Sequence, residues 1–333
     1  MSHGLKPYGQ VGPASPSVKV TSPSFSRNET LIMDLAELPF RITLNSMGER
    51  FEGESLARYL VDADAAIVGL EPVNAALLDR CPKLRLIAKY GVGLDNIDLD
   101  ACKRRGVKVG WTPGVNRYSV AEQTVGTIIG LSRNLFFASR QMREGLWQKI
   151  GGRQISDLTI GIIGLGNVGR ELVRLLQPFG CPILANDVVD IRNFCDQWQV
   201  TPTSKEEIYA RSHVVSLHVP LTEDTRRLMN ASSLAQMRPD SFLINTSRGD
   251  VVDQQALKTC LKAQRIAGAA LDVYACEPPA DMGFLKLPNL VCTPHIAGNS
   301  FEAVVAMGRS ALGHLKEFYQ VGASAERPSR LAA

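Results

Sequence analysis

Short apolar runs alternate with amphipathic stretches along most of the chain. From residue 18 to residue 112, β-rich runs such as AAIVGL and RLIAKY are separated by segments with helical spacing, such as GESLARYL. A second series runs from LTIGIIG to NLVCTPH, with strand starts about 20 to 30 residues apart. Strands that alternate with helices predict parallel sheets covered by helices on both faces. The pattern therefore predicts the α/β class, with two doubly wound parallel-sheet domains.

Several element boundaries follow from the same pattern. VKVTSPS at 18–24 is predicted as a strand, and Ser26-Arg27-Asn28-Glu29 has capping-box spacing for the next helix. Residues 118–145 keep a helical pattern with small residues along it, which predicts one long helix between the two series. The amphipathic stretch 300–319 is predicted to fold back onto the first series. Further helices are predicted to begin near Asn167, Thr203, Ala231 and Asp253.

Length and composition limit the classes of protein. At about 150 residues per domain, a chain of 333 residues suggests two domains. The hydrophobic share of 45% and the charged share of 21% are typical of soluble globular proteins. The net charge of +4 comes from interspersed charges, which favours small anionic substrates and gives weak support for nucleic acid. The apolar runs are too short to span a bilayer, so no membrane association is predicted.

Cysteine usage and the first residues bear on the compartment. The 7 cysteines are scattered and form no CxxC pair, which predicts reduced thiols in a cytoplasmic protein and no metal site. Residues 1–17 are rich in Gly, Pro and Ser and lack the apolar core of a secretory signal. They are therefore predicted to form a flexible leader.

The most specific motif is GLGNVG at 164–169, which matches the G-x-G-x-x-G pattern. A strand-like run precedes it and helical spacing follows it, as a dinucleotide-binding turn requires. Gly164 permits the tight turn, Gly166 lets the backbone approach a pyrophosphate, and Gly169 lets helix and strand pack closely. The helix N-terminus then offers unpaired N–H groups to the phosphates.

An acidic residue is expected at the end of the next strand. Asp187 stands there, about 20 residues after the motif, where its carboxylate can accept hydrogen bonds from the adenosine ribose hydroxyls. A carboxylate would also repel a 2′-phosphate, so the sequence predicts NAD rather than NADP. The alternative is that Asp187 only begins a turn. Arg192 lies a little further along the chain, and its positive charge could weaken the preference for NAD over NADP.

Polar residues also stand at the ends of three later strands. Arg248 follows FLINTS, and His295 follows LVCTP. In GAALDVYACEPP, Asp272 is predicted within the strand and Glu277 lies four residues past Val273. Taken singly, each of these residues is more often structural than catalytic. Arg248 would then be an exposed arginine, Glu277 a solvated glutamate and His295 a histidine at a strand end. Because the carboxyl ends of parallel strands form the ligand edge of an open sheet, together they predict one active site.

Seven segments occur in an order that resembles a known family. They are YGVGLDNIDLDA, SVAEQT, GIIGLGNVG, SLHVPLTEDT, INTSRGDVVD, GAALDVYACEPP and TPHIAG. The chain resembles the D-isomer-specific 2-hydroxyacid dehydrogenases, which include short phosphoglycerate dehydrogenases and glyoxylate/hydroxypyruvate reductases. The resemblance implies NAD-dependent interconversion of a 2-oxo acid and a D-2-hydroxy acid. It also implies a Rossmann NAD-binding domain at 113–304, a flavodoxin-like substrate-binding domain at 18–112 plus 305–333, and a cleft between them.

The family's roles carry over to the matching residues. Arg248 corresponds to the arginine that holds the substrate carboxylate and 2-oxo group, as suits a planar guanidinium. His295 corresponds to the acid/base that protonates the carbonyl oxygen, and Glu277 to the carboxylate that orients the imidazole. The resemblance assigns to the cofactor Gly164, Gly166, Asn167, Val168, Gly169, Asp187, Val219, Pro220, Thr225, Thr246, Ser247, Asp272 and Gly298. Asp272 is expected to accept a hydrogen bond from the nicotinamide carboxamide.

The segment KYGVGLDN resembles the family's substrate loop. The backbone N–H groups of Gly91, Val92 and Gly93 are expected to meet the substrate carboxylate. Lys89 stands where phosphoglycerate dehydrogenases often place an arginine for the phosphate, and a lysine allows a phosphorylated substrate without requiring it. The alternative is that Lys89 is a solvated lysine at a strand end. Arg117 is a second, weaker basic candidate.

Two other functions remain open for a chain that resembles this family. Relatives called C-terminal binding proteins use the same fold as NAD-sensing transcriptional corepressors and keep the same three catalytic residues. Distant relatives oxidise formate or phosphite, although no residue of this chain demands either reaction. The family also leads us to expect a homodimer built through the NAD-binding domain. Which 2-hydroxy acid is used, and whether it is phosphorylated, does not follow from the sequence.

Overall fold

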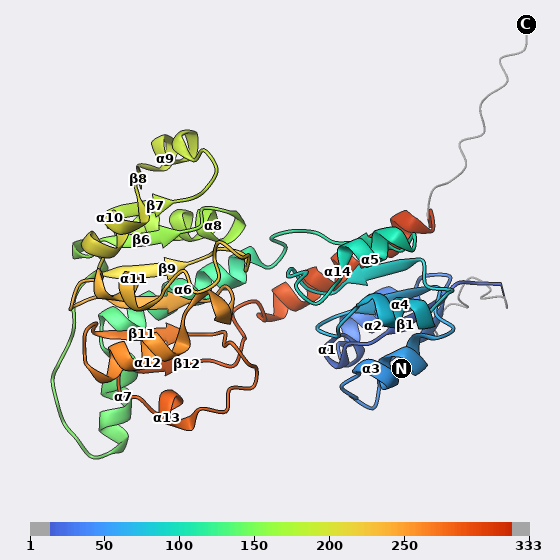
Figure 1. Cartoon of the computed structure of the whole chain (residues 1–333), viewed down its shortest axis with the longest axis horizontal. Helices are drawn as coiled ribbons and strands as arrows, with labels where there is room; N and C mark the ends of the chain where they lie inside the picture. The colour runs from blue at the N-terminus through green and yellow to red at the C-terminus, as the bar shows by residue number, and fades with distance from the viewer. Residues whose placement is uncertain (1–13, 322–333) are drawn as a thin grey trace, which may run out of the picture. The chain divides into compact units, whose positions relative to one another are not determined.

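The computed structural model describes residues 14–321, and these form two compact units (Figure 1). The first unit contains the described residues up to Asn116 and those from Phe301 onward, and the second contains residues 117–300. Most of the predicted leader, residues 1–13, and the last residues, 322–333, lie outside the described part. Ser17, which was assigned to the leader, already begins the first strand.

The first unit is built on a five-stranded sheet in the order β2-β1-β3-β4-β5, in which all paired strands are parallel. This is the flavodoxin-like strand order. Every residue of β3 and β4 is buried, because helices cover both faces. The strands are β1 (Ser17–Val20), β2 (Arg41–Thr43), β3 (Ala65–Val68), β4 (Leu86–Lys89) and β5 (Lys108–Gly110).

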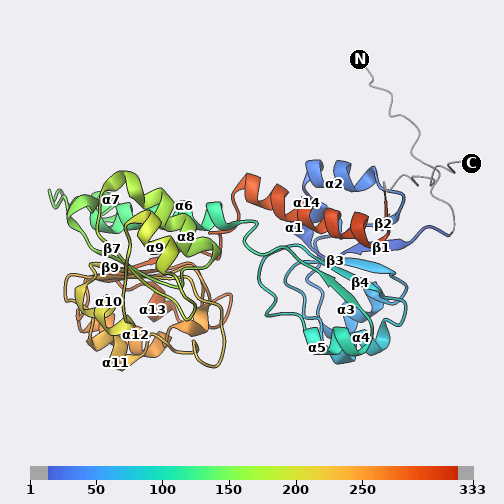
Figure 2. The same ribbon diagram turned by 90° about the horizontal axis from the view of Figure 1, so that it is seen from above.

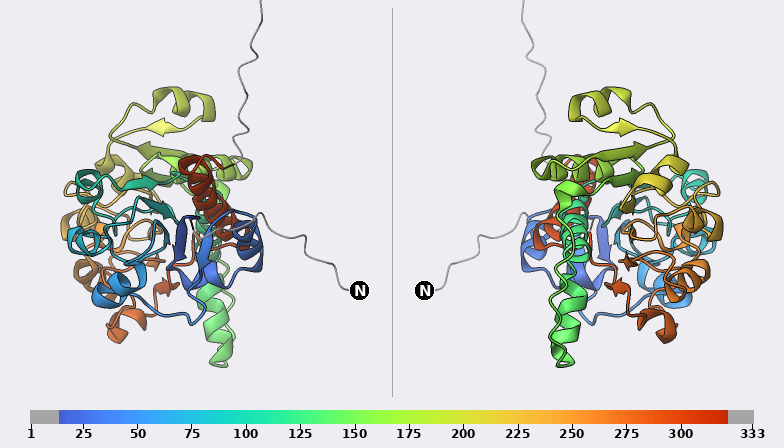
Figure 3. Two further views of the ribbon diagram at one scale, coloured as in Figure 1. Left: turned by 90° about the vertical axis from the view of Figure 1, so that its right-hand side faces the viewer. Right: turned by 90° about the vertical axis from the view of Figure 1, so that its left-hand side faces the viewer.

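Helices cover the two faces of this sheet as separate layers (Figure 2). On one face lie α1 (Pro23–Ser26), α2 (Glu29–Ala36) and α14 (Phe301–Phe318). On the other lie α3 (Gly53–Leu60), α4 (Ala75–Arg80) and α5 (Leu99–Arg104). The final helix α14 packs against α2 and β4, so the last described residues complete the first unit, as Figure 3 also shows.

The second unit is built on a seven-stranded parallel sheet in the order β12-β11-β10-β9-β6-β7-β8. The order reverses at β6, which pairs with β7 on one side and β9 on the other. Ligands of open α/β sheets bind at such a reversal, beyond the carboxyl ends of the strands. The strands are β6 (Ile160–Ile163), β7 (Ile183–Asn186), β8 (Thr201–Pro202), β9 (Val214–Leu217), β10 (Phe242–Asn245), β11 (Gly268–Leu271) and β12 (Leu290–Cys292).

Helices again lie on both faces of the second sheet (Figure 2). The first face carries α6 (Arg117–Ser132), α7 (Leu135–Arg143), α8 (Asn167–Leu176) and α9 (Arg192–Trp198). The second carries α10 (Lys205–Arg211), α11 (Ala231–Ala235), α12 (Gln254–Lys262) and α13 (Met282–Leu285). Short 3-10 turns are η1 (Ile155–Asp157), η2 (Gln177–Phe179) and η3 (Gly249–Val251). Two doubly wound parallel sheets confirm the predicted α/β class.

Three predicted boundaries were wrong. The predicted strand at 18–24 ends at Val20, because Pro23 lies in the first turn of α1. The cap of α2 is Asn28, whose side chain accepts from Leu31 N, rather than a box starting at Ser26. The long helix at 118–145 is two helices, because Asn134 has a left-handed φ of 59°. In residues 14–321, no helix is both long and apolar enough to cross a membrane.

Candidate functional site

The turn from β6 to α8 has the shape that a dinucleotide requires. Gly164 has φ of +95°, and a Cβ there would lie 2.5 Å from the His218 carbonyl oxygen. A Cβ on Gly169 would lie 2.1 Å from the Gly164 carbonyl oxygen. By contrast, no atom beyond the adjoining residues lies within 4 Å of the Cβ position of Gly166. The space beside the backbone of Gly166 is therefore free for a ligand. The turn tolerates no side chain at two positions and admits a close approach at the third.

The N-terminus of α8 adds donors to this turn. The helix spans ten residues and begins at Asn167, and its cap Gly166 supplies no side-chain hydrogen bond. Gly166 and Asn167 are exposed, and Val168 is half-buried. The first N–H groups of the helix and the positive end of its dipole therefore suit phosphate oxygens. These residues fit the pyrophosphate of a dinucleotide.

Asp187 follows β7 and contacts the glycine turn directly. Its Oδ2 accepts from Leu165 N at 2.6 Å, and its Oδ1 accepts from Val189 N at 3.2 Å. Arg192 is paired with Asp190 at 2.7 Å, and these hydrogen bonds lower the pKa of the Asp190 carboxyl to about 2. The one basic side chain considered for a 2′-phosphate is therefore engaged by its neighbour.

The loop after β9 carries the residues predicted to line the adenosine. Thr225 Oγ1 donates to the Pro220 carbonyl oxygen at 2.6 Å, which ties the loop to itself. Val219 is half-buried, and its Cγ1 lies 2.9 Å from the Cβ position of Gly164. Burial lowers the pKa of His218 to about 4. The His218 ring, 2.9 Å from Ser216 Oγ, is therefore neutral at pH 7 and adds no cation beside the cofactor turn.

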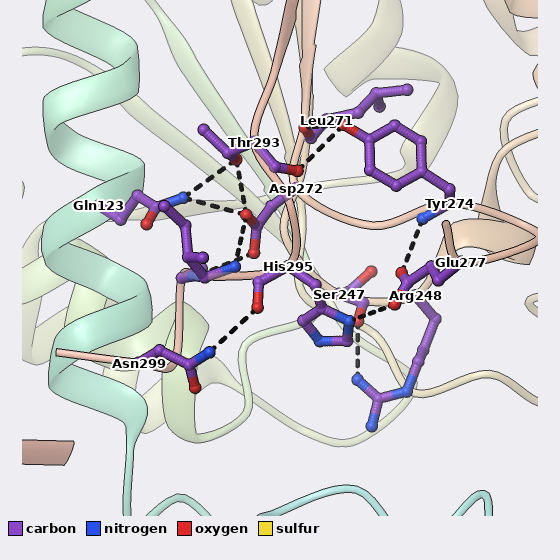
Figure 4. A network of polar contacts seen from close by, with 12 residues as sticks. Gln123, Ser247, Arg248, Leu271, Asp272, Tyr274, Glu277, Thr293, His295 and Asn299 are labelled. Atoms are coloured by element: carbon purple, nitrogen blue, oxygen red, sulfur yellow. Dashed lines mark hydrogen bonds and ion pairs between the residues drawn. The ribbon is translucent and has the colours of Figure 1, made fainter. Parts of the chain in front are cut away.

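A histidine–carboxylate pair lies beyond β11 and β12 (Figure 4). His295 Nδ1 lies 2.7 Å from Glu277 Oε2, and the other carboxylate oxygen, Oε1, accepts from Tyr274 N at 3.0 Å. A carboxylate only accepts, so Nδ1 carries a proton and Nε2 is the nitrogen that can exchange one. The His295 and Glu277 side chains are 42% and 36% exposed, which leaves the pair accessible to a small molecule.

The backbone at His295 is held in an unusual conformation by Asp272. His295 has φ of 54°, a left-handed value that costs a non-glycine residue about 1 kcal/mol or more. Asp272 lies one residue past β11 and is 2% exposed. Its carbonyl oxygen accepts from His295 N at 2.8 Å, and its carboxylate accepts from Ile296 N at 2.9 Å and Ala297 N at 2.8 Å.

Two side chains that the sequence did not single out complete this network. Thr293 Oγ1 donates to Asp272 Oδ1 at 2.6 Å, and Gln123 Nε2 from α6 lies 3.4 Å from the same oxygen (Figure 4). Asp272 was predicted inside the strand, as an acceptor for the cofactor. In the structure β11 ends one residue before Asp272, and the buried carboxylate accepts from internal donors; its contact with the cofactor stays a prediction. Both missed residues stand in the segments SVAEQT and TPHIAG, so the family resemblance was the available signal.

Arg248 follows β10 and lies next to the pair (Figure 4). Its Nη1 donates to the Ser247 carbonyl oxygen at 2.7 Å, and its own carbonyl oxygen accepts from Asn245 Nδ2 at 2.8 Å. Asn245 is buried and also accepts from Ser247 Oγ at 2.8 Å. A Cβ on Gly249 would lie 1.9 Å from the Tyr274 carbonyl carbon, so the turns after β10 and β11 are in contact. Arg248, Glu277 and His295 are thereby brought to one edge of the sheet.

Two predicted cofactor residues lie at the margin of this site. Thr246 lines a cavity of about 330 Å³ between α6 and the sheet, together with Asp272 and Thr293. Gly298 is half-buried and directly follows the buried Ala297. Arg248, Glu277 and His295 do not line this cavity. The cavity is connected to the reacting groups through Asp272, which lines it and accepts a hydrogen bond from His295 N.

Two further basic candidates, Lys89 and Arg117, both have partners within their own unit. Lys89 in the first unit is 3% exposed, and its Nζ donates to the Gly69 carbonyl oxygen at 2.5 Å and to Asn96 Oδ1 at 2.7 Å. The interpretation of Lys89 as a solvated lysine was therefore wrong. In the second unit, Arg117 forms an ion pair with Glu171 at 3.2 Å.

The loop after β4 offers free donors. Gly91 has φ of +139°, and Gly91, Val92 and Gly93 are all half-buried. Among residues 14–321, the N–H groups of these three residues have no acceptor. Three neighbouring N–H groups on a partly exposed loop are suitable donors for an anion.

Comparisons with known proteins agree with this arrangement. Residues 125–297 match the family model of the NAD-binding domain of D-isomer specific 2-hydroxyacid dehydrogenases. The chain is 33% identical over 297 residues to a hydroxypyruvate reductase of Thermotoga maritima, across 87% of this chain and 94% of that protein. It is 38% identical over 274 residues to a glyoxylate reductase of Thermofilum pendens, across 79% of this chain and 80% of that protein.

A solved structure shows the same likeness over both units. D-lactate dehydrogenase from Aquifex aeolicus, crystallised with NAD and lactic acid, is 26% identical and superposes with a TM-score of 0.80. The match covers 91% of this chain and 95% of that one. The chain therefore belongs to the D-isomer specific 2-hydroxyacid dehydrogenase family, is an oxidoreductase, and carries that family's NAD-binding domain at residues 125–297.

Proposed function

We propose that this enzyme reduces a short, unphosphorylated 2-oxo acid with NADH, reversibly, and that glyoxylate or hydroxypyruvate is its substrate. The observation that carries the proposal is the pair of His295 and Glu277, 2.7 Å apart, next to Arg248 at one sheet edge. Two of the relatives above are named for these two substrates.

His295 is the proposed acid/base. Glu277 accepts the Nδ1 proton, which turns Nε2 outward as the nitrogen that gives a proton to the carbonyl oxygen. The carboxylate also stabilises the positive charge of the imidazolium before that proton leaves. When bound, NADH supplies the hydride that reduces the 2-oxo carbon. The alcohol proton thus comes from a side chain of this chain, and the same groups act in reverse during oxidation.

Arg248 is the proposed ligand of the substrate carboxylate and 2-oxo group. Its guanidinium stays charged and can donate two parallel hydrogen bonds to a carboxylate. The N–H groups of Gly91, Val92 and Gly93 are the second proposed set of carboxylate donors, supported by their lack of an acceptor among residues 14–321. Both assignments favour a substrate with a carboxylate beside the reacting carbonyl.

Lys89 is the residue that separates phosphorylated from unphosphorylated substrates. Its ammonium group is buried and already donates to Gly69 and Asn96. A phosphate that took over the ammonium would deprive the Gly69 carbonyl oxygen and Asn96 Oδ1 of this donor, and leaving a buried acceptor unsatisfied costs about 1–3 kcal/mol. This supports glyoxylate or hydroxypyruvate over 3-phosphohydroxypyruvate.

NAD is proposed over NADP because of the charges beside the glycine turn. The Asp187 carboxylate lies beside the glycine turn, where a 2′-phosphate would meet a negative charge. Arg192 pairs with Asp190 and offers no unengaged cation in compensation.

We also propose a homodimer formed through the second unit. After α6, the helix α7 continues past β12 (Figure 1). Six large apolar residues on α7 and the segment after it are between 40% and 74% exposed: Leu135, Phe136, Met142, Leu146, Trp147 and Ile150. Exposed apolar groups gathered in one segment favour a protein interface. Analytical sedimentation tests the homodimer. It is supported if Trp147→Asp sediments as a monomer while the control Met33→Asp on α2 keeps the mass of the wild type. Equal masses in the wild type and both variants would exclude this interface.

The test of the proposed function is a screen of NADH oxidation by the purified protein. Glyoxylate, hydroxypyruvate, pyruvate and 3-phosphohydroxypyruvate are compared, with NADPH in parallel. We expect the highest kcat/KM for glyoxylate or hydroxypyruvate with NADH, a loss of at least about 100-fold in His295→Gln, and little change in His314→Gln. Preference for the phosphorylated acid would assign Lys89 to the phosphate. No turnover of any acid, with NADH still bound, would favour the corepressor-like function.

A further inference from the structure

A tryptophan in the first unit contacts the loop that carries the proposed carboxylate donors. Trp111 Nε1 donates to the Val92 carbonyl oxygen at 2.6 Å. Trp111 directly follows β5, and Ala88 of β4 pairs with Gly110 of β5. This register places Trp111 beside Lys89, at the point where β4 runs into the loop. The indole therefore reaches across the spacing of one strand pair to the middle of Gly91–Gly93.

The two ends of this loop have anchors of their own. At the start, Tyr90 packs edge-on against Phe25 with ring centroids 5.4 Å apart, and its hydroxyl lies 3.1 Å from Ser24 Oγ. At the far end, Asn96 accepts from Lys89 Nζ at 2.7 Å. Among residues 14–321, Trp111 is the one side chain that hydrogen-bonds the backbone of 91–93.

The hydrogen bond from Trp111 to the Val92 carbonyl also sets the direction of the Gly93 N–H. A trans peptide unit is planar, and its C=O and N–H point in opposite directions. A carbonyl of Val92 turned toward Trp111 therefore turns the N–H of Gly93 to the opposite side. Gly93 adds no side chain that would restrain its own peptide, so without the indole this unit could rotate. Trp111 thereby decides the direction of one of the three donors.

We propose that Trp111 is a positioning residue that pre-orients the Val92–Gly93 peptide for the substrate carboxylate. The inference rests on the proposed function of this loop. Pre-orientation lowers the conformational cost of binding and acts on the ground state and the transition state alike. Loss of the indole N–H should therefore weaken 2-oxo acid binding while it leaves the chemical step intact.

The test compares Trp111→Phe, which removes the N–H, with Trp111→His, which keeps a ring N–H donor. Trp198→Phe is the matched control, because Trp198 lies in the second unit on α9. We expect Trp111→Phe to raise the KM of the 2-oxo acid about tenfold, with kcat and the KM of NADH within about twofold of wild type. Trp111→His should recover much of the loss, and Trp198→Phe should match wild type.

A second measurement separates this inference from the proposed function. Crystal structures of both Trp111 variants without substrate report the Val92–Gly93 peptide whether or not the enzyme turns over an acid. A rotated or doubled peptide in Trp111→Phe and a single one in Trp111→His would support the inference. An unrotated peptide in both, or a fall in kcat with unchanged KM, would overturn it. Failure of wild type to reduce any 2-oxo acid would instead count against the proposed function.

Discussion

Glu277 uses its two carboxylate oxygens for different tasks. One accepts from Tyr274 N and thereby holds the side chain to its own backbone, and the other contacts His295 Nδ1. A side chain restrained in this way loses little entropy when it orients a second group. The imidazole is therefore presented with its proton on Nδ1 before any substrate arrives.

The first prediction concerns this carboxylate. Glu277→Gln keeps the size of the side chain but removes the charge that stabilises an imidazolium. We expect kcat to fall roughly 100-fold or more for reduction of the best 2-oxo acid, with the Kd of NADH unchanged. Steady-state kinetics and NADH fluorescence titration measure the two effects, and Glu206→Gln on the exposed surface of α10 is the control. A kcat close to wild type would return Glu277 to an ordinary surface role.

Asp272 illustrates how a buried charge can support a neighbour's geometry. Its carboxylate accepts from N–H and O–H donors in each of its hydrogen bonds within residues 14–321, so replacing one oxygen by an amide NH₂ sets a donor against a donor. Leaving one buried donor unsatisfied costs about 1–3 kcal/mol. The left-handed His295 would lose part of the network that holds it.

The second prediction follows from that argument. Asp272→Asn should lower the free energy of unfolding by about 1–3 kcal/mol and reduce kcat more than it weakens NADH binding. Urea denaturation and single-turnover kinetics test the two effects. Asp253→Asn is the control, because Asp253 caps α12 and asparagine caps equally well. Unchanged stability and kcat in Asp272→Asn would show that the network does not hold His295.

At the scale of elements, α14 shows how one helix completes a core. Its buried residues, among them Val305 and Leu312, join the apolar cluster formed by β1, α2 and β4. Gly308 meets α2 closely, since a Cβ there would lie 2.3 Å from Leu31 Cδ1. Gly313, on the same helix, is exposed, and no atom lies within 4 Å of its Cβ position.

These two glycines give a third, paired prediction. Gly308→Ala should destabilise the protein by about 1–3 kcal/mol, because Leu31 has no space to move aside in a packed core. Gly313→Ala should stabilise it by about 0.5–1 kcal/mol through helix propensity alone. Thermal or urea unfolding of the two variants measures the difference, and equal effects would contradict close packing between α14 and α2.

At the scale of the whole molecule, the apolar cores follow the division into two units. Two clusters flank the seven-stranded sheet and contain only residues between 117 and 300. Two further clusters flank the five-stranded sheet and contain none of those residues. Each unit therefore buries its own apolar surface, as an independently stable domain does.

The fourth prediction tests this division. Residues 117–300, produced alone, should unfold cooperatively and bind NADH, because the glycine turn and Asp187 lie within them. The fragment should reduce no 2-oxo acid, because the Gly91–Gly93 donors are missing. Circular dichroism during heating and NADH fluorescence report the two properties. A fragment that folds but binds no NADH would exclude the assignment of the second unit as a self-sufficient cofactor domain.

The sequence alone determined the features that depend on local pattern. Alternating apolar periods predicted two parallel sheets, and the spacing of Gly164, Gly166 and Gly169 predicted the cofactor turn. Ordered motifs indicated the family. Local pattern failed where a single residue overrides a periodic signal, as at Pro23 and at Asn134, whose left-handed backbone ends a helix that the apolar spacing would continue.

Which side chains meet depends on how the elements pack in the folded molecule. The network that binds Asp272 to the segment after His295 and the burial of Lys89 depend on contacts between residues far apart in the sequence, which no spacing encodes. The contact of Trp111 with Val92 arises because β4 and β5 pair in one particular register. Sequence periodicity gives the face of an element, whereas hydrogen-bond partners depend on strand order and register, which the packed fold alone supplies.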